Sequence, residues 1–215
     1  LVEVLTELDE SNQAVEYLRA ALAVRPDRLE VLMSLGTSLS RAGRIDESHQ
    51  ARSYWIRGIP QGQENSKALY AIWQKFRMEG QTLGIIAAQR SYCEANPDDA
   101  DALILLVRFF LPQPGNDAEI LSTLQRVADL DPVDAERFAW VAHNAAGHMK
   151  SAGKFDDAIK TCRIAIQLDP LDRKSTRQRM VGIYAMLQRW EEAIQTGEQA
   201  IQANPEVAIR WLVLA

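Results

Sequence analysis

Residues 174–207 read KSTRQRMVGIYAMLQRWEEAIQTGEQAIQANPEV. Apolar side chains recur in this stretch at steps of three and four residues, the spacing that places them on one face of a helix. They are Met180, Val181 and Tyr184 in the first half, and Ala193, Ile194, Ala200 and Ile201 in the second. The stretch ends at Asn204-Pro205, and proline cannot continue a helix. The pattern therefore predicts two helices followed by a turn.

Prolines recur along the whole chain at a nearly constant interval. When the close pair Pro112 and Pro114 is set aside, the intervals are 34, 37, 35, 38 and 35 residues, between positions 26, 60, 97, 132, 170 and 205. A fixed period between 20 and 50 residues is the sequence signature of a solenoid. Asp or Asn precedes each of the last four prolines. We find no sustained apolar and polar alternation that would indicate strands.

A helix–turn–helix unit of 34 residues that closes with proline resembles the tetratricopeptide repeat. Several residues match its pattern of a first-helix aromatic and two second-helix alanines seven residues apart. They are Tyr184 and Phe76 at the aromatic, Ala14, Ala158 and Ala193 at the first alanine, Ala21, Ala165 and Ala200 at the second, Leu35-Gly36 with Leu39 in the first helix, and Trp211 at an opening tryptophan. The resemblance implies an all-α fold, a right-handed superhelix (solenoid) of antiparallel helix pairs with about six repeats.

In this register the chain is a single repeat domain covering residues 1–215. The predicted units are 1–28 (truncated), 29–62, 66–99, 101–134, 139–172, 174–207 and a seventh begun at 208–215. Pro112, Pro114 and Gly115 predict that the first helix of the fourth unit ends near Phe110. The chain starts without Met inside an expected helix and stops inside another, so we expect it to be a fragment of a longer protein.

The composition limits the class of protein. The chain is 47% hydrophobic and 25% charged, the balance of a folded globular protein. No apolar run approaches the roughly 18–20 residues of a membrane span, so no direct membrane insertion is expected. The formal charge of −5 argues against a nucleic-acid partner, because such proteins carry a basic footprint. Two cysteines, Cys93 and Cys162, are too few for a disulfide framework and favour a reducing, cytoplasmic location.

The sequence contains no recognisable catalytic, metal or cofactor site, and the protein is not expected to be an enzyme. His143 and His148 are five residues apart and lack the spacing of a zinc pair. Cys93 and Cys162 are expected to be buried structural thiols. The acidic pairs 98–99 and 156–157 are interpreted as residues that complement helix N-termini.

The remaining candidate for function is the concave face, which in this family is lined mainly by the first helix of each unit. Outward positions on those helices predict a peptide-binding groove with aromatic and basic side chains. Its candidate residues are Arg41, Lys67, Tyr70, Gln74, Arg77, Phe109, Trp140, His143 and Lys150, with Met33, Thr37, Leu105 and Gln178 at further lining positions. The alternative is that Phe109 and Trp140 simply pack against the irregular fourth unit.

One sub-class of the family, the chaperone co-factors, grips a carboxylate with Lys and Asn on successive repeats. Met33, Thr37, Tyr70 and Gln74 stand at the corresponding positions here, so this chain is not expected to belong to that sub-class.

Three functions follow from the sequence as hypotheses. The first is a non-catalytic scaffold that binds a peptide or protein segment with some acidic character in its concave groove. The second is the repeat region of a larger enzyme of the sulfotransferase, glycosyltransferase or methyltransferase type, guiding protein substrates or oligomerisation. The third is a homo-oligomer formed through the terminal repeats, where Trp211 and Leu214 would stack on another copy.

Overall fold

The computed structural model describes residues 10–26, 28–58, 74, 76–205 of the chain, and these form two compact units, Leu1–Ala102 and Leu103–Ala215. The described residues are helical, with short turns and no strand. The predicted all-α fold of successive helix pairs is thus confirmed. Within the described part of the chain, no helix combines the length and the apolar character needed to cross a bilayer.

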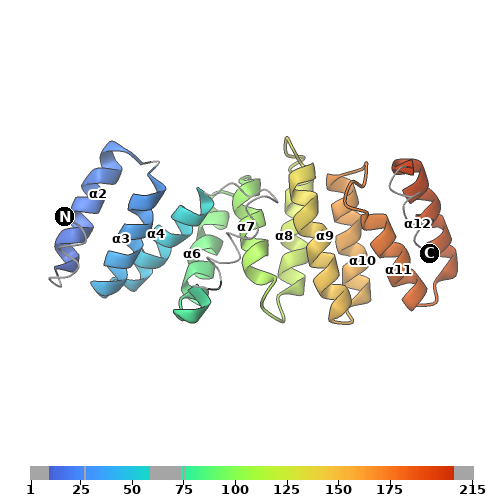
Figure 1. Cartoon of the computed structure of the whole chain (residues 1–215), viewed down its shortest axis with the longest axis horizontal. Helices are drawn as coiled ribbons and strands as arrows, with labels where there is room; N and C mark the ends of the chain where they lie inside the picture. The colour runs from blue at the N-terminus through green and yellow to red at the C-terminus, as the bar shows by residue number, and fades with distance from the viewer. Residues whose placement is uncertain (1–9, 27, 59–73, 75, 206–215) are drawn as a thin grey trace. The chain divides into compact units, whose positions relative to one another are not determined.

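The first unit contains α2 (Ser11–Val24), α3 (Leu29–Arg41), α4 (Ile45–Arg57) and α6 (Thr82–Ala95). Helix α3 packs against both α2 and α4, and α4 packs against α6 (Figure 1). The core of the α2–α4 layer is made of small and branched apolar side chains, namely Val15, Leu18, Leu35, Leu39 and Ala51. Leu32, Leu35 and Leu39 of α3 are buried and follow one another at steps of three and four residues, which places them on one face of the helix.

The second unit contains most of α7 (Ala100–Phe110), then α8 (Asp117–Asp129), α9 (Glu136–Ser151), α10 (Phe155–Leu168), α11 (Thr176–Met186) and α12 (Trp190–Ala203). Helix α10 packs most extensively against α9 and also contacts α8 and α11, while α11 pairs with α12 (Figure 1). The alanines of α9 at 139, 142, 145 and 146 are all buried, which lets neighbouring helices approach closely. Helix α7 ends at Phe110, as the following prolines predict.

The turn inside each helix pair repeats one backbone feature. A residue with left-handed φ lies 17 residues before each of the last five periodic prolines. These residues are Gly43 (φ 74°), Gly80 (69°), Gly115 (92°), Gly153 (75°) and Gln188 (58°). The period inferred from the prolines is therefore also a period of the backbone. The unit bounds and the expected longer parent protein stay predictions.

Candidate interaction surface

Three of the predicted groove residues lie on one face of α9. Trp140, His143 and Lys150 are three and seven residues apart, which aligns them along the helix. All three side chains are half-buried. The opposite face of α9 carries Val141, Ala145 and Met149 and belongs to the core. The amphipathic pattern of α9 thus places a tryptophan, a histidine and a lysine at the surface.

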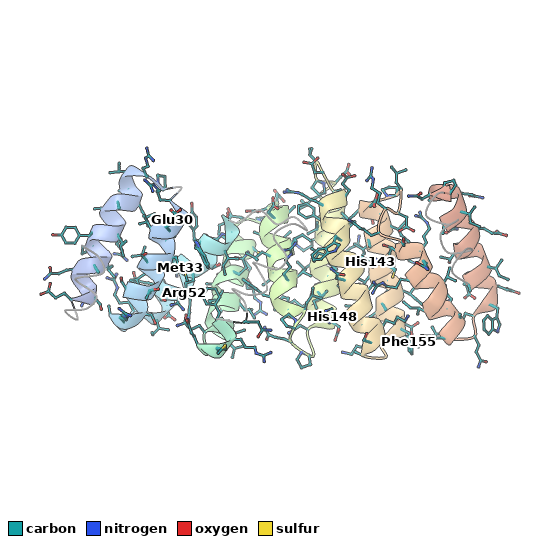
Figure 2. All side chains as sticks on the ribbon, in the orientation of Figure 1. Glu30, Met33, Arg52, His143, His148 and Phe155 are labelled. Atoms are coloured by element: carbon teal, nitrogen blue, oxygen red, sulfur yellow. The ribbon has the colours of Figure 1, made fainter. Side chains whose placement is uncertain are left out.

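Helix α11 adds an arginine that lies across α9. A Cβ atom built on Gly147 would lie 1.9 Å from Nη1 of Arg179, so the guanidinium occupies the space that a side chain at 147 would need. The same guanidinium donates a hydrogen bond through Nη2 to Nε2 of His143, which Figure 2 labels on α9. Glycine at 147 therefore permits the close approach of Arg179 to the α9 backbone.

The hydrogen bonds of His143 define its protonation state. Arginine can only donate, so Nε2 of His143 must be the accepting, unprotonated nitrogen. Nδ1 then carries the proton and donates to Oγ1 of Thr176 at 3.1 Å. Burial, with smaller contributions from Arg179 and Lys174, lowers the pKa of His143 to about 4. His143 is thus a neutral positioning group at physiological pH, and Arg179 carries the charge.

A second cation lies further along the same face. Nζ of Lys150 is 3.8 Å from the position of a Cβ on Gly182 of α11. In the part of the chain that the structure describes, neither Lys150 nor Arg179 has a carboxylate within ion-pair distance. We call Trp140, His143, Lys150 and Arg179 the α9–α11 surface. It combines an aromatic ring with two cations for which the described residues supply no acidic partner.

Neighbouring groups hold this surface in place. The Arg108 guanidinium lies over the Trp140 ring at 5.3 Å, within the range of a cation–π contact. The Asp172 carboxylate accepts the N–H of Thr176 at 2.5 Å and the N–H of Arg177 at 3.0 Å. It therefore caps the N-terminus of α11, the element that carries Arg179. Burial raises the pKa of Asp172, and these two N–H donors oppose that effect.

The other predicted groove residues lie elsewhere. Arg41 and Arg77 are exposed and Gln74 is half-buried, all in the first unit. Lys67 and Tyr70 lie outside the described residues. Phe109 is 4% exposed and Leu105 is 1% exposed, so both pack in the interior and their side chains are not available to a partner. For Phe109 this corresponds to the packing alternative that the sequence left open.

The other candidate groups of the sequence are structural. Cys93 and Cys162 are buried, and burial raises the pKa of the Cys162 thiol to about 12. Oδ1 of Asp99 accepts the N–H of Ala102 at 2.9 Å at the start of α7, which is the capping role expected of that acidic pair. Asp156 and Asp157 lie in the first turn of α10. Among residues 10–205 where described, no cluster of three His, Cys, Asp or Glu side chains could hold a metal ion.

Sequence reasoning missed Arg179. The interpretation chose Gln178 as the lining residue of α11, whereas the side chain that crosses to α9 is one position later. The available signal was the pair Gly147 and Gly182, which are 35 residues apart and thus at equivalent positions of adjacent units. A glycine at that position leaves room for a long side chain from the first helix of an adjacent unit, but only the contact itself identifies which side chain.

Successive helix pairs with a common turn and a common period define the class of helical-repeat proteins. The family model of the tetratricopeptide repeat matches residues 4–61. Over these residues the chain is similar to the tetratricopeptide repeat, in agreement with the resemblance of its sequence pattern. A comparison with curated protein sequences finds no match.

Solved structures with a similar arrangement include several repeat proteins. The crystal structure of MamA has a TM-score of 0.43 and 15% identity, with 94% of each chain covered. YrrB, described as a TPR protein with an unusual peptide-binding site, has a TM-score of 0.40 and 18% identity over 83% of this chain and 87% of that one. The Naa15/Naa10 structure bound to HypK-THB has a TM-score of 0.46 and 15% identity over 95% of this chain and 31% of that one.

Proposed function

We propose that the chain is a non-catalytic protein-interaction scaffold whose α9–α11 surface binds a peptide or protein segment with acidic side chains. The observation that supports this proposal is the pair Lys150 and Arg179, which have no carboxylate partner among the described residues. Trp140 stands on the same face of α9. Tryptophan and arginine are the residue types most enriched among side chains that dominate binding energies.

The local geometry favours binding because Arg179 is held in place before a partner arrives. Its guanidinium is fixed by His143 and by the cleft above Gly147, so little side-chain freedom is lost on binding. Burial lowers the pKa of Arg179, yet an arginine remains charged at any ordinary pH. A partially desolvated, fixed guanidinium is well suited to a carboxylate, which it can meet with two parallel hydrogen bonds.

Binding to short peptides tests the proposal. The probe is an array of 12-residue peptides, each with three Glu around one Phe or Leu at varied spacing, together with copies in which Gln replaces Glu. We expect some Glu peptides to bind the whole chain, and Lys150→Glu to weaken these by at least about fivefold. Lys160→Glu is the matched control, since Lys160 is an exposed lysine on α10.

Equal loss in both variants would show that net charge rather than the α9–α11 surface controls the interaction. Equal binding of the Gln copies would show that the acidic side chains are not what the protein recognises. Arg41 and Arg77 of the first unit stay predicted contacts, to be tested on the same array. The absence of a nucleic-acid partner and the cytoplasmic location also stay predictions.

Self-association through the C-terminal repeat is part of the same proposal. Trp211 and Leu214, which the sequence predicts at such a contact, lie outside the described residues. Helix α12 exposes Ile194 (65%) and Ile201 (51%), whereas Ile159, 35 residues before Ile194, is 5% exposed in α10. Apolar stripes of this kind on a monomer mark interaction sites. We expect sedimentation to show a mass that rises with concentration, and Ile194→Lys to abolish that rise. A constant monomer mass would contradict self-association without touching the peptide proposal.

A further inference from the structure

A second open surface lies on the other side of α11. Helices α10 and α12 form its walls and α11 its floor, and the space between them is about 640 Å³. Met180 and Tyr184 of α11 lie at the bottom, Arg163 of α10 lies on one wall, and Gln195 and Gln199 of α12 lie on the other. We call this space the α10–α12 groove.

The groove is separate from the α9–α11 surface. Successive residues of an α-helix are about 100° apart, so Met180 and Tyr184 lie on one face of α11. Arg179 lies about 120° and Gly182 about 180° around the helix from the middle of that face. Their contacts agree, because Arg179 and Gly182 approach α9 whereas Met180 and Tyr184 line the space between α10 and α12. A ligand on one surface therefore leaves the other free.

The groove is positively charged. Its lining includes Arg163, Arg177 and Arg189, against one acidic residue, Glu192. Arg177 lies 3.7 Å from the Asp172 carboxylate, so the charge of the groove comes mainly from Arg163. That carboxylate is held by Arg189 at 2.6 Å, and the Arg189 guanidinium also lies 4.8 Å from the Tyr184 ring centroid. Arg163 donates to the Tyr184 hydroxyl at 3.4 Å and has no carboxylate partner among the described residues.

In the first unit, the arginine at the helix position that corresponds to Arg163 is paired with a carboxylate. Arg19 of α2 and Arg163 of α10 each lie eight residues after the first residue of a 14-residue helix. Arg19 is paired with Glu47, three residues after the N-cap of α4. The counterpart of Glu47 is Glu192, which pairs with Arg189 and does not reach Arg163. A carboxylate that the first unit supplies internally is thus missing beside Arg163.

The α12 wall suits an extended backbone. Gln195 and Gln199 are exposed and four residues apart, so both point into the groove from one face of α12. Each amide side chain offers donors and an acceptor, which can pair with the N–H and C=O of a neighbouring chain. A 14-residue helix is about 21 Å long, a span that about six extended residues would cover.

We propose that the α10–α12 groove binds a short, extended, acidic segment of a partner protein, with one carboxylate on Arg163 and its backbone along Gln195 and Gln199. The scaffold would then hold two partners, one on each side of α11. This inference does not depend on the α9–α11 surface being a binding site, because the two surfaces use different side chains.

The same peptide array tests the groove when it is read against three variants. Arg163→Glu should weaken a class of Glu peptides by at least about fivefold, and Lys160→Glu, three residues earlier on α10 and outside the groove, should leave them within about twofold. Lys150→Glu should leave this class unchanged and affect another. Peptides of the first class with Lys in place of one Glu should bind Arg163→Glu better than they bind the original chain. Circular dichroism establishes that each variant is folded.

Three results would overturn the inference. The first is an array on which no peptide distinguishes Arg163→Glu from Lys160→Glu. The second is an array on which every peptide that binds is weakened by Lys150→Glu and none is weakened by Arg163→Glu, which would leave the α9–α11 proposal standing by itself. The third is a dimer of the original chain that Arg163→Glu dissociates, because the occupant would then be a second copy of this protein.

Discussion

At the scale of single residues, the turn position before each second helix carries the clearest energetic consequence. Four of the five equivalent residues with left-handed φ are glycines, and the fifth is Gln188. A side chain in this region brings Cβ close to the following carbonyl oxygen and costs roughly 1–2 kcal/mol. The last described pair therefore carries a strain that the other pairs avoid.

Exchanging these residues should change stability in opposite directions. We expect Gln188→Gly to stabilise the protein by about 0.5–1 kcal/mol, and Gly153→Ala to destabilise it by about 1 kcal/mol. No atom lies within 4 Å of a Cβ built at Gly153, so the second effect would come from the backbone alone. Thermal unfolding of both variants measures this. A loss of stability in Gln188→Gly would mean that contacts of the glutamine side chain outweigh its backbone strain.

His143 gives the protein a specific dependence on pH. Its pKa is about 4 in the folded chain, below the usual value of 6.5, so the unfolded state binds more protons between these values. Folding stability is then fully present above pH 6.5 and declines as the pH falls towards 4.

A variant without an ionisable ring should lose this contribution. We expect the unfolding temperature of the original chain to fall between pH 7.5 and 5.5 by more than that of His143→Gln. Glutamine keeps an acceptor for Arg179, so the comparison isolates the titration from the hydrogen bond. Parallel declines in the two proteins would show that other groups cause the pH dependence.

At the scale of elements, glycines determine which helices can exchange long side chains. Gly147 accepts Arg179 from α11, and in the first unit Gly84 of α6 accepts His49 of α4, whose ring carbon would lie 1.9 Å from a Cβ at 84. Burial lowers the pKa of His49 as it does that of His143. In both units, a basic side chain that lies against a glycine is therefore partly desolvated: His49 at Gly84 and Arg179 at Gly147.

Replacing Gly147 and Gly182 by alanine tests whether a long side chain lies directly against the glycine. Gly147→Ala should push the flexible end of Arg179 away from His143. The pKa of His143 should then rise from about 4, because the ring is less buried and the repulsion by the Arg179 charge is weaker. Gly182→Ala is the matched control, since its nearest atom is 3.8 Å away. Titration of the histidine ring protons by NMR measures both. An unchanged pKa in Gly147→Ala would mean that Arg179 keeps its place.

At the scale of the whole molecule, each repeat is stabilised mainly by its neighbours along the chain. Leu39 is 2% exposed and belongs to the core of α2, α3 and α4, so Leu39→Ala should cost about 2–4 kcal/mol locally. We expect amide hydrogen exchange to accelerate in these three helices and to stay unchanged in α9 to α12. Uniform acceleration along the chain would indicate a single cooperative unit instead.

Much of this fold could be predicted from residue spacing. The prolines and the alanine pairs indicated helix pairs of nearly constant length, because helix termination and close packing are local properties. The surface was harder to predict. Trp140, His143 and Lys150 were found because they recur on one face of α9. The same rule of helical spacing selected Phe109 on α7, but its side chain is buried. Burial of Phe109 and the crossing of Arg179 depend on contacts between helices that the period does not contain.

Helix α11 contributes to both proposed binding surfaces, Arg179 to one and Met180 and Tyr184 to the other, within 11 residues. If occupancy of one surface shifts or orders this helix, the affinity of the other surface must change by the same factor in both directions. The short helix would then act as a thermodynamic link between two partners that never touch. The coupling between the two sites is positive if the first ligand orders α11 for the second, and negative if the first ligand moves α11 away from the second site.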